Sequence, residues 1–201
     1  MSRFSEHSEE VLFSAIRRRT FAAAALSFAV FIIPSAGAEP VRATDVRACE
    51  AVFSPAESGF AAIGRLLEGA QKSVFVSAYH FKSLNVADML IAAARRGVRV
   101  AVVLDVKNLD SKKHRADYAA RNGIEVYVDG RHHSHHSKYM VVDGRFVQTG
   151  SFNYNDHAEH DNAENLLVLE SPTLAAAYLK DWEKHREHAV SYLKMSEQSE
   201  K

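Results

Sequence analysis

The chain has 201 residues, of which 47% are hydrophobic and 25% are charged, with 25 basic and 25 acidic side chains. This length suits one domain with a sizeable hydrophobic core, and the even charge balance argues against a general nucleic-acid binder, which is usually basic overall. Because Cys49 is the only cysteine of the chain, an intrachain disulfide is excluded.

The first 38 residues are predicted to form a secretory signal peptide. A polar segment that ends in three arginines, 17–19, precedes the apolar stretch 21–33, and 36–38 supply an A-x-A cleavage site. The apolar stretch is too short to span a bilayer comfortably. We therefore expect a mature chain that begins near Glu39, is periplasmic or secreted, and has no stable membrane association. An uncleaved anchor and a signal of the twin-arginine type are the alternatives.

Residues 39–195 are predicted to form a single domain, and 196–201 a polar tail. Loss of residues 1–38 removes four arginines and three glutamates, which leaves 21 basic and 22 acidic residues. A partner rich in phosphate would therefore have to bind local basic patches rather than a generally basic surface.

Strand and helix patterns alternate along this domain. Apolar runs predict strands at 48–53, 74–79, 98–105, 124–128 and 166–169. Apolar residues at helical spacing predict helices at 54–69, 85–96, 111–121 and 173–188. Pro55 is placed near the first turn of one helix and Asn85 at the N-cap of the next. The pattern predicts an α/β fold, a mixed β-sheet flanked by helices on both faces in a single domain.

A β-hairpin is predicted from Lys138 to Gly150. The four residues 139–142 are apolar or aromatic, so they favour a strand that enters the core. Asp143-Gly144 then supplies a two-residue turn that sends the chain back as a second strand.

Side chains at the ends of this hairpin suit phosphodiester chemistry. His136 and Lys138 are two residues apart on an extended segment, so they project to the same side. A neutral imidazole attacks phosphorus and holds it as phosphohistidine. Lys138, Ser151 and Asn153 offer donors to the non-bridging phosphate oxygens. We therefore interpret His136 as the nucleophile and the other three as phosphate-binding residues, with no metal and no other cofactor required.

The spacing of these residues is His136-x-Lys138-x4-Asp143-x6-Gly150-Ser151-x-Asn153. This pattern resembles the HKD signature of the phospholipase D superfamily, and Glu164-Asn165 resembles the acidic element that follows it there. The resemblance covers residues 45–190 and is greatest to the small bacterial nuclease branch with one motif per chain. It implies a phospholipase D-like sandwich and a metal-independent phosphodiesterase whose active site is built from two motifs.

A second motif is not found in the chain. His80-Phe81-Lys82 has the His-x-Lys spacing, but the next acid, Asp88, comes one residue late, and no Gly-Ser-x-Asn follows. We therefore expect a homodimer, in which a two-fold axis pairs His136 with its own copy.

In this hypothesis one His136 attacks phosphorus and the protonated His136 of the second copy gives a proton to the leaving oxygen. Glu164 is expected to accept a hydrogen bond from the far ring nitrogen of His136 and so to fix its tautomer. The predicted catalytic set is His136, Lys138, Asp143 and Glu164. Within it, Asp143 lies at the hairpin tip and is expected to orient the motif without touching substrate.

The histidine-rich segment suggests a competing interpretation. His132, His133, His135 and His136, with His157 and His160 downstream, could together bind Zn²⁺ or Cu²⁺. We interpret the first three as polar loop residues near an anion and predict no metal in the active site.

The function that we expect is an exported, sequence-nonspecific endonuclease that cleaves DNA, with RNA as a further candidate substrate. A single motif in a compact chain leaves little room for lid domains that select a lipid head group, and no basic amphipathic helix is evident. The alternative is a phospholipase D or phosphatidyl transferase that acts on phospholipid head groups. A non-catalytic binding module is a third class, against which the complete His/Lys/Asn/Glu set argues.

Overall fold

The computed structural model describes residues 39–47 and 49–199, so the predicted signal peptide lies outside the described residues. The chain divides into two units, Met1–Glu39 and Pro40–Lys201, and the second contains an eight-stranded sheet. The strands are β1 Cys49–Ser54, β2 Ser73–Ala78, β3 Arg99–Asp105, β4 Glu125–Asp129, β5 Lys138–Val142, β6 Phe146–Gly150, β7 Glu164–Glu170 and β8 Val190–Ser191.

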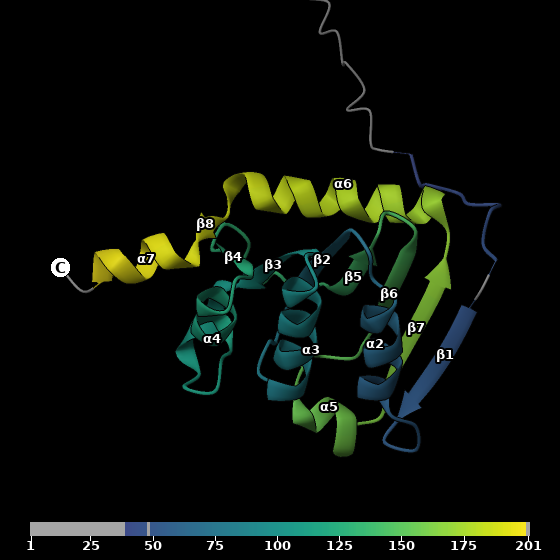
Figure 1. Cartoon of the computed structure of the whole chain (residues 1–201), viewed down its shortest axis with the longest axis horizontal. Coiled ribbons are helices and arrows are strands. Elements are labelled where there is room, and N and C mark those ends of the chain that lie inside the picture. The colour runs from purple at the N-terminus through teal and green to yellow at the C-terminus, as the bar shows by residue number, and fades with distance from the viewer. Residues whose placement is uncertain (1–38, 48, 200–201) are drawn as a thin grey trace, which may run out of the picture. The chain divides into compact units, whose positions relative to one another are not determined.

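The sheet is mixed, as predicted. Its strand order is β1-β7-β6-β5-β2-β3-β4-β8 (Figure 1). The pairs β2–β3 and β3–β4 are parallel, and every other pair is antiparallel. The predicted hairpin is confirmed as β5 and β6, and all five residues of β5 are buried.

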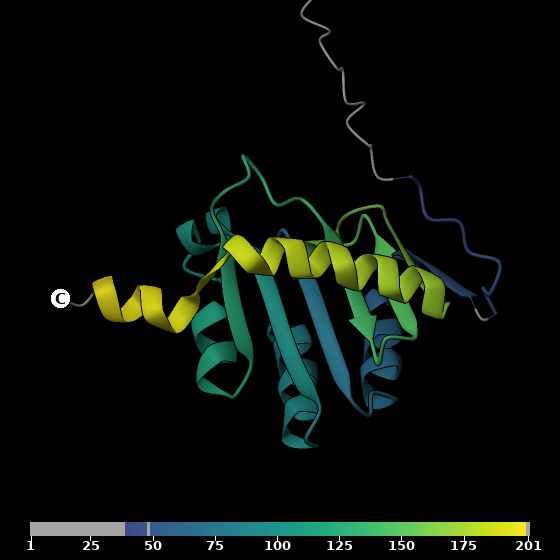
Figure 2. The ribbon, with the colours of Figure 1, turned by 90° about the horizontal axis from the view of Figure 1, so that it is seen from above.

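Helices cover both faces of the sheet, which confirms the predicted architecture. Helix α6 crosses one face, and α2 and α3 lie on the other (Figure 2). The helices are α2 Gly59–Glu68, α3 Leu84–Arg95, the 3-10 helix η2 Val106–Asp110, α4 Ala116–Arg121, α5 Asp156–His160, α6 Pro172–His188 and α7 Tyr192–Ser199.

Each face of the sheet has its own hydrophobic core. Strand β2 shows the alternation, because Val76 packs with the α2 and α3 side chains and Phe75 packs with Trp182 of α6. The indole Nε1 of Trp182 also donates to the Val76 carbonyl oxygen at 2.8 Å. This buried side chain therefore fixes α6 to the middle of the sheet.

Two helix starts differ from the prediction. Helix α2 begins at Gly59 rather than near Pro55, because residues 55–57 form a turn and the Ser58 hydroxyl caps the helix by accepting from the Ala61 N–H at 3.0 Å. Helix α3 is capped by Ser83 rather than Asn85.

Three further differences lie near or after β3. Helix α4 begins at Ala116, five residues after the predicted start at Ser111, since Asp105 accepts from the Lys107 N–H at 2.8 Å and starts η2 instead. The short helix α5 was not predicted. Helix α7 includes residues 196–199, which were predicted as part of a polar tail. Among the described residues, no helix combines the length and the hydropathy needed to cross a bilayer.

Candidate active site

Four strand ends meet at one edge of the sheet and carry the predicted site residues. Strand β5 starts at Lys138, which pairs with Ala78 at the end of β2. Strand β6 ends at Gly150, which pairs with Leu166 near the start of β7. Since neighbouring strands run in opposite directions here, residues far apart in the sequence come together at this edge.

Lys138 contacts the His136 residue directly. Its ammonium donates to the His136 carbonyl oxygen at 2.6 Å and lies 3.0 Å from the ring nitrogen Nδ1. The same ammonium lies 4.9 Å from the centroid of the Tyr79 ring, whose centroid is 4.1 Å from that of the His136 ring. Tyr79 ends the predicted strand 74–79, and no motif in the sequence marks it as part of the site.

The environment of Lys138 prepares it to bind an anion. Burial lowers the pKa of Lys138, and the negative charge of Glu164 opposes this shift. The ammonium is largely removed from water, with the residue only 7% exposed. A phosphate oxygen that reaches it is therefore attracted more strongly than it would be by a solvated lysine.

Ser151 and Glu164 form a second part of the site. The Ser151 hydroxyl donates to Glu164 and accepts from the Asn165 backbone N–H at 3.1 Å. The other carboxylate oxygen of Glu164 accepts from Asn162 Nδ2 at 2.9 Å. The expected contact between Glu164 and the His136 ring does not appear among the hydrogen bonds of the described residues. Each carboxylate oxygen accepts one bond, from Ser151 or Asn162, and keeps a further lone pair.

Asn153 retains hydrogen-bonding capacity. Its side-chain Oδ1 is buried and makes no hydrogen bond, although its carbonyl oxygen accepts from the Asn155 N–H at 2.8 Å. An unpaired buried carbonyl oxygen is costly, so a group that donates to Oδ1 is favoured. Contact with a phosphate oxygen would instead use the Nδ2 donor of the same amide.

One open cavity of about 630 Å³ brings these groups together. Five of the six predicted site residues line it: His136, Lys138, Ser151, Asn153 and Glu164. Tyr178 and Asp181 of α6 line it as well, and Asp181 accepts from the Tyr139 hydroxyl at 2.9 Å. Both residues lie in the predicted helix 173–188, and no motif in the sequence marks either as part of the site.

Asp143 lies apart from this cavity, at the other end of β5. Its carboxylate accepts from three backbone N–H groups, those of Gln71, Lys72 and Ser73, at 2.7 to 2.9 Å. The structure thus separates Asp143 from the other members of the predicted catalytic set and gives it the orienting position expected at the hairpin tip.

The histidine-rich segment does not gather as a single group. His135 is buried, and its Nε2 lies 2.6 Å from the Ser77 hydroxyl, while His133 is exposed. His132 instead joins a cluster with Asp129, His185 and His188, in which one ligand atom from each residue lies within 4.8 Å of the others. Among the described residues, His157 and His160 belong to no such cluster.

Comparison with known families gives one match that spans most of the domain. The family described as "Cardiolipin synthase, PLD-like domain" matches residues 63–186. The crystal structure of "a phospholipase D family member, Nuc" from Salmonella typhimurium superimposes with a TM-score of 0.70 at 30% identity, over 72% of this chain and 97% of that chain.

Two curated relatives carry names that refer to lipids. A "Phospholipase D" of Rickettsia conorii is 33% identical over 130 residues, 65% of each chain, so the match spans slightly less than two thirds of that relative. A "Mitochondrial cardiolipin hydrolase" of Xenopus laevis is 30% identical over 154 residues, which are 77% of this chain and 73% of that protein.

Proposed function

The chain belongs to the phospholipase D superfamily, and from this premise we propose that it is an exported, metal-independent phosphodiesterase that cleaves nucleic acid within the strand. The observation that supports the proposal most directly is the contact between Lys138 and His136 at the mouth of a polar cavity. A nucleophilic imidazole beside a desolvated ammonium is what attack on a phosphodiester anion requires.

The proposed reaction has two steps. First, a nitrogen of His136 attacks phosphorus, and the P–O bond to the leaving group breaks as a protonated imidazole gives that oxygen its proton. Lys138 and Asn153 meanwhile donate to the non-bridging oxygens. Second, the now neutral imidazole takes a proton from water while the water oxygen attacks phosphorus and the P–N bond breaks, which restores both rings.

Lys138 sets the tautomer of the His136 ring in the substrate-free protein. An ammonium only donates, so its contact makes Nδ1 the acceptor and places the proton of a neutral ring on Nε2. A bound phosphate draws the ammonium away, the proton moves through solvent to Nδ1, and the lone pair of Nε2 becomes free to attack. Glu164 lines the same cavity and is the acceptor available for the Nδ1 proton.

A second imidazole is needed as the acid, and His80 is a candidate in the same chain. Its ring stacks on Tyr79 at 4.2 Å, next to the contact of Tyr79 with His136. However, burial and the nearby charges of Lys82, Lys138 and His136 lower the pKa of His80. His80 is therefore rarely protonated near pH 7, so we assign the acid to the His136 of a second copy in a two-fold homodimer.

The lining of the cavity favours a polar substrate over a lipid surface. Every lining residue except Gly150 carries a polar side-chain group. The large hydrophobic side chains that are exposed among the described residues do not line it: Val41, Val46, Phe53, Leu84, Tyr118, Val190 and Leu193. Enzymes that work on a bilayer surface present clustered apolar side chains to it, so DNA and RNA suit this site better.

A lipid substrate is the second candidate function, and the names of the Rickettsia and Xenopus relatives favour it. The chain would then hydrolyse or exchange phospholipid head groups as a phospholipase D or phosphatidyl transferase. The chemistry at His136 would be the same, because both substrates are phosphodiesters.

The decisive experiment offers the purified protein three substrates in EDTA: plasmid DNA, single-stranded RNA, and vesicles of phosphatidylcholine with cardiolipin. We expect nicking of DNA and cleavage of RNA without lipid turnover. His136→Ala should lose this activity, while His157→Ala, which alters an exposed histidine of α5, should keep it. Lipid turnover without nicking would establish the lipid alternative, and activity that survives in His136→Ala would remove the proposed nucleophile.

Export is proposed from the sequence of residues 1–38. Expression in a bacterium followed by fractionation should place the protein in the periplasm or the medium, with a new amino terminus near Glu39. An uncut chain in the membrane fraction would support the anchor instead.

A further inference from the structure

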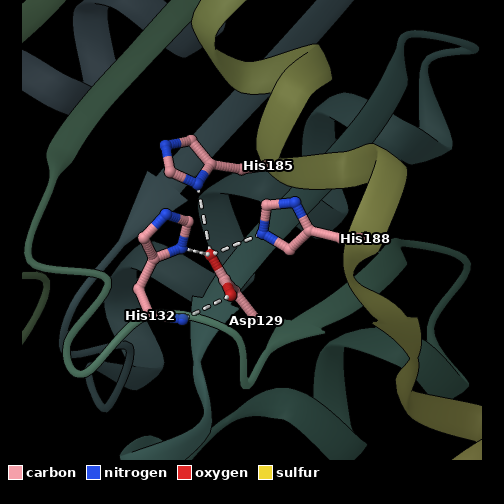
Figure 3. A group of neighbouring side chains, drawn as sticks. All are labelled: Asp129, His132, His185 and His188. Atoms are coloured by element: carbon pink, nitrogen blue, oxygen red, sulfur yellow. Dashed lines mark hydrogen bonds and ion pairs between the residues drawn. The ribbon is translucent and has the colours of Figure 1, made fainter. Parts of the chain in front are cut away.

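We propose that Asp129, His132, His185 and His188 bind one Zn²⁺ ion, which fastens the segment that carries His136 to the end of helix α6 (Figure 3). This site is separate from the phosphodiester chemistry, and the proposed function does not depend on it.

The fold brings the four side chains together from three elements. Asp129 is the last residue of β4 and pairs with Asp105 at the end of the parallel strand β3, so it lies at the edge of the sheet. His132 follows in the loop that leads to His136. His185 and His188 are three residues apart in the last turn of α6 and therefore share one face of that helix.

The geometry is close to that of a four-coordinate site. The distances from Asp129 Oδ2 are 2.8 Å to His132 Nδ1, 3.1 Å to His185 Nδ1 and 3.2 Å to His188 Nε2. A tetrahedral zinc site with bonds of 2.0–2.1 Å places neighbouring ligand atoms about 3.3 Å apart. The contacts of Asp129 already approach this spacing, and rotation of the imidazole rings closes the wider gaps.

Hydrogen bonding to Asp129 does not account for the cluster. A carboxylate oxygen has two lone pairs, yet His135 Nδ1 also stands 3.2 Å from Oδ2 and is the fourth imidazole nitrogen around it. The Nε2 atom of His188 is buried and makes no hydrogen bond, although it faces Asp129 at an ion-pair distance. A cation between these groups would pair with the lone pair of this nitrogen.

The surroundings also suit a metal ligand set. The second oxygen of Asp129 accepts from the Arg131 backbone N–H at 2.9 Å, which fixes the carboxylate and leaves Oδ2 for an ion. The far nitrogen of His185 faces the Asp181 carboxylate at 3.7 Å. Asp129 is fully buried, while the three imidazoles are 18% to 45% exposed, and they line a cavity of about 640 Å³ through which an ion can enter.

The donor set selects the ion and its role. Three imidazoles and one carboxylate in a roughly tetrahedral arrangement suit Zn²⁺ better than Mg²⁺ or Ca²⁺, which prefer oxygen ligands, or Cu²⁺, which prefers a square-planar site. Four protein ligands leave no open position for water, as in structural zinc sites. The ion would hold the loop at His132, four residues before His136, against α6. Helix α6 also contributes Tyr178 and Asp181 to the lining of the active-site cavity.

The test is metal binding rather than catalysis. Full-length or exported protein, stripped of metal and titrated with Zn²⁺, should bind one ion per chain. Replacement of Zn²⁺ by Co²⁺ should give the intense visible absorption of a four-coordinate ion. The double variant His185→Ala/His188→Ala should lose affinity by about a hundredfold or more. The matched control His133→Ala alters an exposed histidine of the same loop and should bind as the wild type does.

Two further variants make the result unambiguous. His132→Ala does not alter α6, so it can be tested even if the double variant does not fold. It should show the same loss of affinity for Zn²⁺. His136→Ala should keep its zinc, which separates failure of the metal site from failure of the proposed nucleophile. Affinity that is unchanged in both His132→Ala and the double variant, or Co²⁺ spectra of a six-coordinate ion, would overturn the proposal.

Discussion

Gly150 and Asn165 approach so closely across β6 and β7 that a Cβ atom on Gly150 would lie 2.2 Å from the Asn165 carbonyl oxygen. The φ of Gly150 is +146°, which L side chains rarely adopt. The same carbonyl oxygen accepts from the Ser151 N–H at 3.0 Å, and this contact sets the Ser151 hydroxyl beside Glu164. The glycine of the motif is thus a requirement of the backbone.

Gly150→Ala should therefore damage both stability and the site. Backbone strain and overpacking together are expected to lower the free energy of unfolding by about 3 kcal/mol. Gly64→Ala is the matched control. Gly64 lies inside α2, and a Cβ there would make only ordinary contacts with Met89 of α3, so the substitution should stabilise the helix by about 0.5–1 kcal/mol. Urea unfolding of both variants checks this, and equal effects of the two substitutions would contradict it.

Lys138→Ala should reduce the rate of phosphodiester cleavage severely, because it removes a desolvated charge from the cavity. One lost donor to the developing charge costs about 10²–10³ in kcat, and the lost charge adds to this. Steady-state kinetics on a short oligonucleotide, with Lys107→Ala as the control lysine, measure the effect. A fall of less than about tenfold would argue that Lys138 only positions His136.

The alkaline limb of the pH profile should report Lys138. Since burial holds its pKa below the usual lysine value, the side chain loses its proton at a lower pH than an ordinary lysine does. Above that pH the ammonium is neutral, so kcat/KM should fall. Lys138→Arg should be slower at every pH but should lack this limb, because a guanidinium does not titrate there. An unchanged limb in the arginine variant would assign it to another group.

The hairpin could be predicted because its determinants are local. Asp143 and Gly144 both adopt positive φ, 56° and 62°, in a turn that the Arg145 N–H closes by donating to the Val142 carbonyl oxygen at 3.0 Å. The connection between the paired residues Val142 and Phe146 has three residues rather than the predicted two. The start of α2 was misplaced because its support comes from far away in the sequence. Glu159 of α5 accepts from the Ser58 hydroxyl and, at 2.9 Å, from the Phe60 N–H, across about a hundred residues.

The same distinction applies to the site. His136, Lys138, Ser151 and Asn153 share one hairpin, so spacing alone brought them together. Tyr79 meets the His136 ring only through the order of the strands, and Asp181 reaches the cavity only through the course of α6. The cluster around Asp129 escaped prediction for the same reason, because its helix ligands lie more than fifty residues along the chain from the strand that carries Asp129.

Asp143→Asn should weaken the fold in a pH-dependent way. Burial alone would raise the pKa of Asp143, but three backbone N–H groups more than offset this and hold it below its usual value. The carboxylate therefore contributes stability that is complete above the unfolded-state pKa and is lost as pH falls through the folded-state pKa. We expect a loss of about 2 kcal/mol at pH 7 that shrinks toward pH 3.

Urea unfolding across this pH range measures the effect of Asp143→Asn, with Asp110→Asn as an exposed control. Asparagine tolerates the positive φ at this position, so the substitution tests charge rather than backbone conformation. A destabilisation of the same size at every pH would mean that the charge of Asp143 has no part in it.

Asn153→Ala should slow the reaction by about 10²–10³ in kcat if the amide donates to the phosphate in the transition state. Stability should change little, because the buried Oδ1 makes no hydrogen bond in the substrate-free protein. The control is Asn85→Ala, on an exposed position of α3. A large loss of stability with normal kcat per folded molecule would assign Asn153 a purely structural role.

Subunit mixing should show whether the second imidazole comes from a second copy. If each site needs His136 from both subunits, random exchange of equal amounts of wild type and His136→Ala leaves about one quarter of the dimers active, and activity per milligram falls to about one quarter of wild type. Independent sites would give one half instead. His80→Ala in every subunit should cost less than about tenfold, because the lowered pKa of His80 leaves little of its imidazole protonated near pH 7. Analytical ultracentrifugation measures the number of subunits. An active monomer would contradict the dimer, and so would half activity in the mixture together with a severe loss in His80→Ala. Either result would assign the role of general acid to His80.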